Sequence, residues 1–372
     1  PEYLTNVTFF DIMVISTKIM DKESKMSENK VTVYTLAQEL GVSVAAISRA
    51  FDPKSRLSRE KREMILRTAA KYGYKPNRIA SRLSMEPIHI GVLNFGYIKN
   101  FYTEIQNGIV NAYNTLRDYK LECDMRVLQR GEHTMQEALS VLDEFYEKRY
   151  DGVIISGIYE DCVIGYINRL AKAGIRVATV HYNLENSDRL FASLSNYQVI
   201  GQMAAELCGM LLRNSPARET VMFTGNQSSI PHRILTKSFR TSSEKFGFPV
   251  AAVYDTKDSP ECAAELIGEA FAAHPNLAAI YVSSANSIPI CRYLAEHGLS
   301  QKVVCVTSDV FAELCPYIEN GTVNATIYQN PFSMGYTALD LLYHAIAEGK
   351  KVDGCICSTP HIVLSSNLNC YR

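Results

Sequence analysis

The sequence predicts a small all-α helix-turn-helix head followed by a larger α/β body of two lobes. Two observations lead to this prediction. Residues 30–85 hold twelve lysines and arginines against four aspartates and glutamates, a net charge of +8. From residue 88 onward, short β-rich runs alternate with helical patterns. Such alternation is typical of parallel sheets wound with helices.

Charge is distributed unevenly along the chain of 372 residues. The whole chain has a net charge of −1, because the basic head is offset by residues 1–29 at −2 and the remaining residues at −7. A basic head on an acidic body indicates a polyanionic partner for the head alone. No apolar run reaches the roughly 20 residues that span a bilayer. The ten cysteines include no C-x-x-C pair, so we expect free thiols in a reducing cytoplasm and neither a metal site nor a cofactor.

The first residues do not fit this pattern. Residues 1–29 begin without methionine, and Met26 directly precedes the basic segment as a natural start would. We therefore expect residues 1–29 to be an extension without function. The alternative is a weak pairing strand over residues 7–16.

Residues 30–75 are expected to form the head. Thr35 is expected to cap a first helix through Leu40, and Gly41 to end it, since the turn needs positive φ. Ser43 is expected to cap a second helix over residues 44–50.

A third helix is expected from a cap at Ser58 to Gly73. Its apolar stripe is predicted to be Met64, Ile65 and Ala69. The predicted head core adds residues of the first two helices and the turn, namely Leu36, Leu40, Val42 and Ile47.

In a helix-turn-helix, the N-terminal end of the second helix enters the major groove. Val44 and Ala45 would make apolar contacts there, and Arg49 would contact guanine or phosphate. Ser43, Ser48, Arg56 and Arg59 are better placed for the DNA backbone. The predicted DNA-contacting residues of the head are thus Thr35, Ser43, Val44, Ala45, Ser48, Arg49 and Arg56. The alternative is a small helical bundle that binds no nucleic acid.

The segments LAQELGVSVAAISRAF, LSRE and YGYKPNRIASRL (residues 36–51, 57–60 and 72–83) resemble the head of the lactose/galactose-repressor (LacI/GalR) family of bacterial transcription regulators. The resemblance implies that Val44 and Ala45 set specificity and that Arg49 contacts the operator. It implies a hinge helix within residues 76–87, where Asn77 and Ala80 contact DNA and Leu83 enters the minor groove. Such a short helix would order only on DNA, beside its partner copy. Here the linker after the hinge is shorter than is usual in the family, and it is not basic.

Nine strands are expected in the body, residues 88–365, with helical patterns between them. So many residues exceed one sheet of ordinary domain size, which predicts two lobes with a ligand between them. The expected strands are residues 88–95, 121–128, 151–157, 175–183, 219–226, 248–255, 277–284, 302–309 and 323–331.

The body also resembles the family's sensor, which has the two-lobed fold of periplasmic sugar-binding proteins. The matching segments include IGVL, SSANS, TSDV and ATIYQNPFSMGY. With the head, the resemblance covers residue 31 to about residue 365, and it implies a periplasmic-binding-protein-like sensor.

A polyhydroxylated ligand needs hydrogen-bonding side chains and a flat apolar face. Asp309 could accept two hydroxyls and Gln329 could donate and accept. By resemblance, Asp309 matches the sugar-contacting aspartate of the family and Gln329 matches the glutamine of the family pattern. The other predicted effector contacts are Tyr97, Phe101, Tyr182, Asn196, Arg233 and Asn286. Leu235 stands where the family usually has an arginine, and HYN at residues 181–183 where an aspartate is common. These departures leave open an effector that is not an ordinary hexose.

The predicted function is a cytoplasmic, nucleoid-associated repressor. It would bind operator DNA as a homodimer under the control of a sugar or polyol, acting as inducer or as corepressor. Two alternatives are regulators of the same fold that respond to a nucleobase or to a phosphoprotein corepressor instead of a sugar. An enzyme is disfavoured because no nucleophile elbow, phosphate loop or metal-spaced histidine pair is present. A secreted solute-binding protein is disfavoured by the basic head and by the lack of a signal-peptide pattern.

Overall fold

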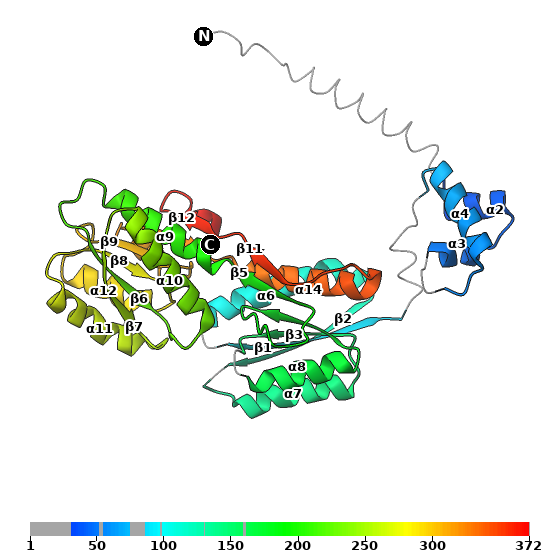
Figure 1. Cartoon of the computed structure of the whole chain (residues 1–372), viewed down its shortest axis with the longest axis horizontal. Coiled ribbons are helices and arrows are strands. Elements are labelled where there is room, and N and C mark those ends of the chain that lie inside the picture. The colour runs from blue at the N-terminus through cyan, green and yellow to red at the C-terminus, as the bar shows by residue number, and fades with distance from the viewer. Residues whose placement is uncertain are drawn as a thin grey trace, which may run out of the picture. The chain divides into compact units, whose positions relative to one another are not determined.

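The computed structural model describes residues 31–51, 55–74, 86–96, 99–129, 131–158 and 161–371. It divides into two compact units, Pro1–Glu86 and Pro87–Arg372, which are considered one at a time below (Figure 1). Three predictions lie outside the described residues: the extension over residues 1–29, the hinge helix with Asn77, Ala80 and Leu83, and the stacking role of Tyr97.

The described part of the head consists of three helices, α2 (Val33–Leu40), α3 (Val44–Phe51) and α4 (Arg59–Lys71). Each helix contributes two side chains to one small core, made of Leu36, Ala37, Ile47, Ala50, Ile65 and Ala69. Gly41 ends α2 with φ of 62°, as the sequence predicted. The tight turn that follows places α2 and α3 in a helix-turn-helix.

The cap of the first helix differs from the prediction. Thr32, not Thr35, is the N-cap residue, and its hydroxyl accepts a hydrogen bond from the backbone N–H of Thr35 at 3.2 Å. The helix starts earlier because Val33 packs against the head core and so extends the apolar face by one turn. In α3 the predicted cap is confirmed, since the Ser43 hydroxyl accepts from the Ala46 N–H at 3.2 Å.

The third helix also departs from the prediction in two details. Ser58 occupies the N-cap position of α4, but its side chain makes no capping hydrogen bond. Met64 is 42% exposed rather than part of the apolar stripe. Ile65 and Ala69 are one helical turn apart and face the core, so the neighbouring Met64 is rotated toward solvent.

In the described part of the body, two six-stranded sheets form the two lobes. The first has strand order β11-β5-β4-β3-β1-β2 and is parallel throughout. Its strands are β1 (Ile88–Gly96), β2 (Leu121–Gln129), β3 (Gly152–Ser156), β4 (Arg176–Val180), β5 (Phe191–Ser195) and β11 (Cys355–Ser358).

The second sheet has strand order β12-β10-β9-β8-β6-β7. It is parallel except at β12, which pairs antiparallel with β10. Its strands are β6 (Glu219–Thr224), β7 (Val250–Asp255), β8 (Leu277–Val282), β9 (Val304–Ser308), β10 (Ala325–Tyr328) and β12 (His361–Val363). All nine predicted strands are present. β5, β11 and β12 were not predicted, because they are short and rich in serine, cysteine or histidine.

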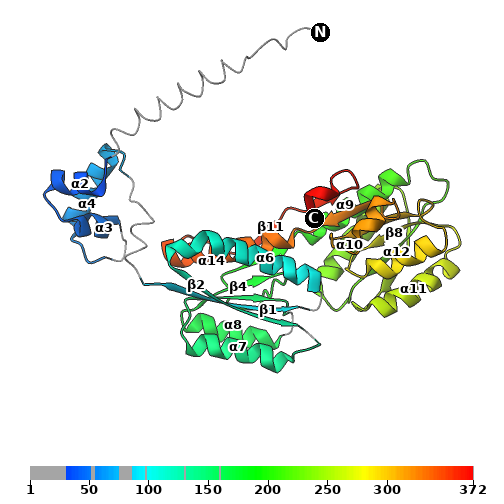
Figure 2. The same cartoon turned by 180° about the vertical axis from the view of Figure 1, so that it is seen from behind.

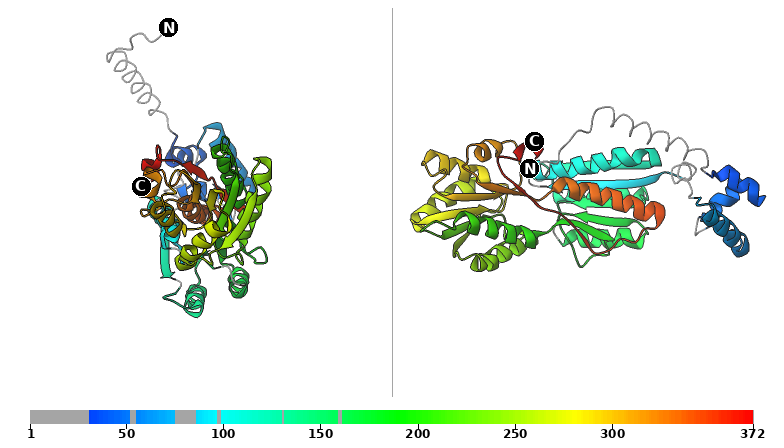
Figure 3. Two further views of the ribbon diagram at one scale, coloured as in Figure 1. Left: turned by 90° about the vertical axis from the view of Figure 1, so that its left-hand side faces the viewer. Right: turned by 90° about the horizontal axis from the view of Figure 1, so that it is seen from above.

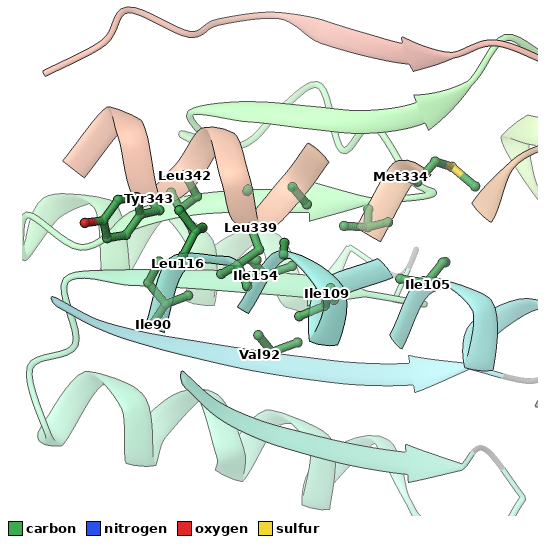
Figure 4. Packing of buried hydrophobic residues seen from close by; sticks show 14 of the residues in the cluster. Ile90, Val92, Ile105, Ile109, Leu116, Ile154, Met334, Leu339, Leu342 and Tyr343 are labelled. Atoms are coloured by element: carbon green, nitrogen blue, oxygen red, sulfur yellow. The ribbon is translucent and has the colours of Figure 1, made fainter. Parts of the chain in front are cut away.

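Helices cover both faces of the first sheet (Figures 1 and 2). On one face, α6 (Lys99–Leu116) and α14 (Pro331–Glu348) pack onto β1, β3 and β4. Figure 4 shows this core, in which Ile105, Ile109 and Leu116 follow one another along α6, and Met334, Leu339 and Leu342 along α14. The other face carries α7 (Met135–Glu147) and α8 (Cys162–Lys172).

The second sheet is covered in the same way. One face carries α9 (Tyr197–Leu211) and α10 (Ile230–Lys245), and the other carries α11 (Pro260–Ala273), α12 (Ser287–Glu296) and the short α13 (Cys315–Glu319). Short 3-10 turns occur at Arg117–Tyr119 and Leu368–Tyr371. Leu368 belongs to the core of the second lobe, so the body extends beyond residue 365, where its end was predicted. None of the described helices is both long and apolar enough to cross a membrane.

Helices α6 and α14 approach each other closely, and Figure 3 shows them side by side from above. Glycines make this approach possible. A Cβ atom on Gly335 would overlap the carbonyl oxygen of Ile105, and one on Gly108 would overlap that of Phe332. The backbones of the two helices are therefore in direct contact at these points.

Among the described residues, the chain passes from one lobe to the other between β5 and α9, between β10 and α14, and between β11 and β12. The three crossing segments are tied together at Gln329. Its carbonyl oxygen accepts hydrogen bonds from the hydroxyl of Ser195 at 3.2 Å and from that of Ser358 at 2.8 Å. Neither lobe is a continuous stretch of sequence as a result.

Candidate functional site

A cavity lies where the carboxyl ends of strands from both sheets meet. His181 follows β4, Ser283 follows β8 and Asp309 follows β9, as expected for a site between parallel sheets. The cavity measures about 50 Å³. Its lining residues are Phe101, Tyr102, His181, Tyr182, Tyr197, Pro231, His232, Leu235, Asp258, Ser283, Ser284, Ala285, Asp309 and Gln329.

Asp309 is held in place by Gln329. The Gln329 side-chain amide donates to Asp309 Oδ2 at 2.8 Å, and the Gln329 backbone N–H donates to Oδ1 at 3.3 Å. Burial raises the pKa of Asp309 to about 6, although these two hydrogen bonds oppose the shift. The carboxylate therefore carries its charge at neutral pH at a cost, and a polar ligand could compensate for its lost hydration.

His181 lies among four aromatic rings. Its ring centroid is 4.3 Å from that of Tyr182, 4.9 Å from Phe101, and 5.9 Å from both Tyr102 and Tyr197. The Tyr197 hydroxyl donates to the His181 carbonyl oxygen at 2.9 Å. Burial lowers the pKa of His181 to about 3, so the imidazole is neutral at physiological pH.

His232 and Asp258 form the opposite side of the cavity. His232 Nε2 lies 3.6 Å from Asp258 Oδ1. Burial lowers the pKa of His232, against the opposing charges of Asp258 and Asp255. Gly225 lies directly behind this pair, and a Cβ atom there would overlap both side chains.

The α3 surface of the head can be described separately. Ala45, Ser48 and Arg49 are exposed on this helix, whereas Val44 is half-buried against the head core. Thr35, Ser43 and Arg56 are exposed too, although the hydroxyl of Ser43 caps α3.

Comparisons with known proteins identify the family. A family model of the periplasmic binding protein domain matches residues 90–351. The chain is 25% identical to catabolite control protein A of Priestia megaterium over 228 residues, which cover 60% of this chain and 64% of that protein. It is 23% identical to the HTH-type transcriptional regulator DegA of Bacillus subtilis over 244 residues, 64% of this chain and 69% of that protein. The chain belongs to the periplasmic binding protein domain family. Its similarity to these regulators supports the LacI/GalR family.

A solved structure confirms the fold of the body. The glucose-galactose binding protein GanP of Geobacillus stearothermophilus superposes with a TM-score of 0.66 at 20% identity, covering 76% of this chain and 99% of that one. The chain spans just under two thirds of the length of the catabolite control protein named above. The body thus has the same fold as that binding protein.

Of the predicted effector contacts, the structure brings Phe101, Tyr182, Asp309 and Gln329 together at the cavity. It places the other three described residues outside the lining. The Asn196 amide oxygen accepts from the Val199 N–H at 3.1 Å and so caps α9. Arg233 is exposed and donates to the Ser228 carbonyl at 2.8 Å. Asn286 donates to the Thr256 hydroxyl at 3.2 Å.

Several lining residues were not predicted, notably Tyr102, His181, Tyr197, Asp258 and Ser283. Their position along the strands is a signal that could have found some of them. His181 and Ser283 lie near the carboxyl ends of predicted strands and directly follow β4 and β8, and Asp258 comes three residues after β7. His232 lies on the first turn of α10, which no strand pattern indicates.

Proposed function

We propose that this protein is a sequence-specific DNA-binding transcriptional regulator, a repressor, whose operator affinity is controlled by a small polar ligand in the sensor cavity. The observation that carries the proposal is the exposed face of α3, where Ala45, Ser48 and Arg49 are available on a head segment of net charge +8. The same chain also contains a cavity between two lobes with a buried carboxylate.

The head would place the N-terminal end of α3 in the major groove. Arg49 can then make a bidentate contact to guanine or hold a phosphate, while Ala45 can contact a thymine methyl group. Ser43, Ser48 and Arg56 would position the head on the backbone. Since Val44 is half-buried, the apolar reading surface is largely Ala45, and DNA deformability would contribute to the choice of operator.

Two copies would bind together. A homodimer presents its two heads to a pseudo-palindromic operator, because half-sites mirror the two-fold symmetry of the protein. Asn77, Ala80 and Leu83 would belong to a hinge helix that orders on DNA, with Leu83 wedged into the minor groove. The protein would act in the cytoplasm, at the nucleoid.

The sensor would work by relative movement of its lobes. A cavity of about 50 Å³ is far smaller than the several hundred Å³ of ordinary ligand pockets. A sugar or polyol would therefore enter only after the lobes separate, and it would stabilise one of two lobe arrangements. Asp309 and Gln329 would bind hydroxyl groups, and Phe101 and Tyr182 would stack on the apolar face of the ligand.

Gln329 would link the ligand to this movement. Its side chain holds Asp309 in the cavity, and its backbone carbonyl joins the crossing segments at Ser195 and Ser358. A ligand hydroxyl could replace the Gln329 side-chain amide as the hydrogen-bond donor to Asp309. This exchange would disturb the segments that connect the two lobes. The spacing of the two hinge helices, and with it operator affinity, would change in response.

A gel-shift experiment tests the proposal. Operator fragments are first selected from a random DNA pool with the wild-type protein, and binding is then compared for Arg49→Ala, Asp309→Ala and the control Arg67→Ala, which removes an exposed arginine of α4. We expect Arg49→Ala to abolish operator binding but leave ligand binding intact. Asp309→Ala should bind DNA but lose its ligand response, and Arg67→Ala should stay close to wild type.

Two results would contradict the proposal. Failure to select any DNA in low salt would favour a solute-binding protein without a regulatory role, since phosphate contacts are strongest there. Wild-type operator affinity in Arg49→Ala would reject α3 as the recognition helix.

A further inference from the structure

The side chains that line the sensor cavity carry more negative than positive charge. They include two carboxylates, Asp258 and Asp309, whereas no lysine or arginine appears among the described lining residues. His181 and His232 add no positive charge at neutral pH, because burial lowers the pKa of each imidazole. Inside a protein such an imbalance acts strongly on a ligand, since the effective dielectric constant is well below that of water.

Polar atoms at the cavity also lack partners within the described structure. Asp258 Oδ1, His232 Nδ1 and Ser283 Oγ are buried and make no hydrogen bond. The second carboxylate oxygen of Asp258 accepts only a backbone N–H, that of Asn226, at 3.2 Å. Asp258 Oδ1 lies 3.6 Å from the His232 imidazole, beyond hydrogen-bond distance, and a buried carboxylate oxygen without a hydrogen bond is costly. A donor on the ligand, best a charged one, would satisfy it.

The cavity lining is also rich in aromatic rings. Phe101, Tyr102, Tyr182 and Tyr197 surround His181, and all five residues line the cavity. Aromatic walls attract cations through the negative faces of their rings. A carboxylate and several aromatic rings in one cavity are the groups that recognise a protonated or alkylated amine.

Backbone geometry supports a binding role for three of these residues. His181, Asp258 and Asp309 have φ of 74°, 58° and 67°, the left-handed region that residues other than glycine rarely occupy. Each follows a strand of the sensor and each lines the cavity. Strain of this kind is concentrated at ligand sites, where the surrounding fold maintains it.

We propose that the ligand of this cavity carries a positively charged nitrogen, as in an amino sugar or an aminated polyol, with Asp258 as the partner of that nitrogen. Asp309 and Gln329 bind the hydroxyl groups, and the aromatic wall covers the remaining face. The cavity selects against phosphorylated sugars and sugar acids, because it offers an anion no cationic side chain. The inference rests on the proposed role of the cavity as a ligand site and not on the DNA-binding role of the head.

Titration calorimetry of the full chain at neutral pH tests this inference. Three matched series, each given as aminated, neutral and anionic member, are used as probes. The first is D-glucosamine, D-glucose and D-glucose 6-phosphate, and the second is D-galactosamine, D-galactose and D-galacturonate. The third, without an anionic member, is N-methyl-D-glucamine and D-glucitol. We expect the aminated member to bind at least about tenfold more tightly than its neutral counterpart in one or more series. We expect no binding of the anionic members.

Two variants locate the effect. In Asp258→Asn, the preference for the aminated compound should fall to about twofold or less while the neutral counterpart binds as before. The control is Asp255→Asn, which removes a nearby carboxylate that accepts from the Gln227 and Lys257 backbone N–H groups and does not line the cavity. This control should keep the wild-type preference. A preference retained in Asp258→Asn would overturn the assignment of that residue.

The remaining outcomes separate this inference from the proposed function. If neutral sugars bind as tightly as their amines, the charge inference fails and the cavity remains a sugar site. If no aminated compound binds, the inference fails as well. A gel shift with the same preparation then shows independently whether the DNA-binding part of the proposed function stands.

Discussion

The head and the sensor differ in how much core supports them. The described head buries six apolar side chains in one cluster, whereas the sensor has four clusters on the two faces of its two sheets. Small domains bury a smaller fraction of their surface and are marginally stable. The stability of the head should therefore depend on local interactions such as helix caps. The sensor should tolerate the loss of a single such interaction.

Backbone strain follows the same division. In the described head, positive φ occurs at Gly41 and Gly73, where it costs little. The described sensor adopts positive φ at nine residues other than glycine, His181, Asp258 and Asp309 among them, at a cost of about 1–3 kcal/mol for each residue. A large core permits this cost at a binding cavity, which the head could not sustain.

The largest expected effect comes from the contact between α6 and α14. Gly335→Ala should destabilise the sensor by about 4 kcal/mol or more, because the new Cβ overlaps the carbonyl of Ile105. The matched control is Gly165→Ala in α8, where nothing lies within 4 Å of the added Cβ. That change should stabilise the sensor by about 0.5–1 kcal/mol. Denaturant unfolding measures both, and equal effects would contradict the close helix contact.

Acid should weaken the sensor through His181. Its folded pKa of about 3 lies below the value of 6.5 for an exposed histidine, so its contribution is present above pH 6.5 and is lost as pH falls toward 3. The loss between pH 7 and pH 4 is about 3 kcal/mol. His181→Asn, which tolerates positive φ, should remove this part of the pH dependence. His297→Asn, at an exposed histidine, should leave it unchanged.

Asp309 should act in the opposite direction. Its folded pKa of about 6 lies above the ordinary value of 3.8, so stability is greatest below pH 3.8 and falls as pH rises through 6. The decrease between pH 4 and pH 7 is about 2 kcal/mol. Asp309→Asn should therefore gain stability relative to wild type at pH 7 but not at pH 4, as followed by thermal unfolding. Asp353→Asn, at an exposed site, should show no such gain.

The smallest expected effect tests the head alone. Thr32→Ala should destabilise the head by about 1 kcal/mol, because it removes the cap of α2. Thr35→Ala should cost less, since the Thr35 hydroxyl contacts the Thr32 hydroxyl rather than a free backbone N–H. Hydrogen exchange of the α2 amides measures both changes. Loss of protection in the sensor would show that the two units are not independent in stability.

Sequence patterns predicted most of the fold for clear physical reasons. The turn at Gly41 and the cap at Ser43 depend only on neighbouring residues. Strands such as β1 and β8 are recognisable from their long apolar runs. The short strands β5, β11 and β12 form because neighbouring strands pair with them, which local pattern cannot indicate.

The candidate cavity was predictable to a smaller extent. Asp309 and Gln329 were found because resemblance and strand ends agreed. Arg233 and Asn286 were predicted to line the cavity, but the structure places them outside its lining. Chain position does not determine side-chain direction, and both side chains form hydrogen bonds within their own lobe. His232 and Tyr197 reach the cavity from helices, so their placement depends on how the helices pack.

The triple crossing between the lobes has a consequence for synthesis on the ribosome. β11 adds a strand to the first sheet and β12 adds one to the second, and both follow α14 along the chain. During translation, neither lobe can complete its sheet until this segment has emerged. A premature stop after α14 would leave an open edge on both lobes at once, and such edges are sites of aggregation.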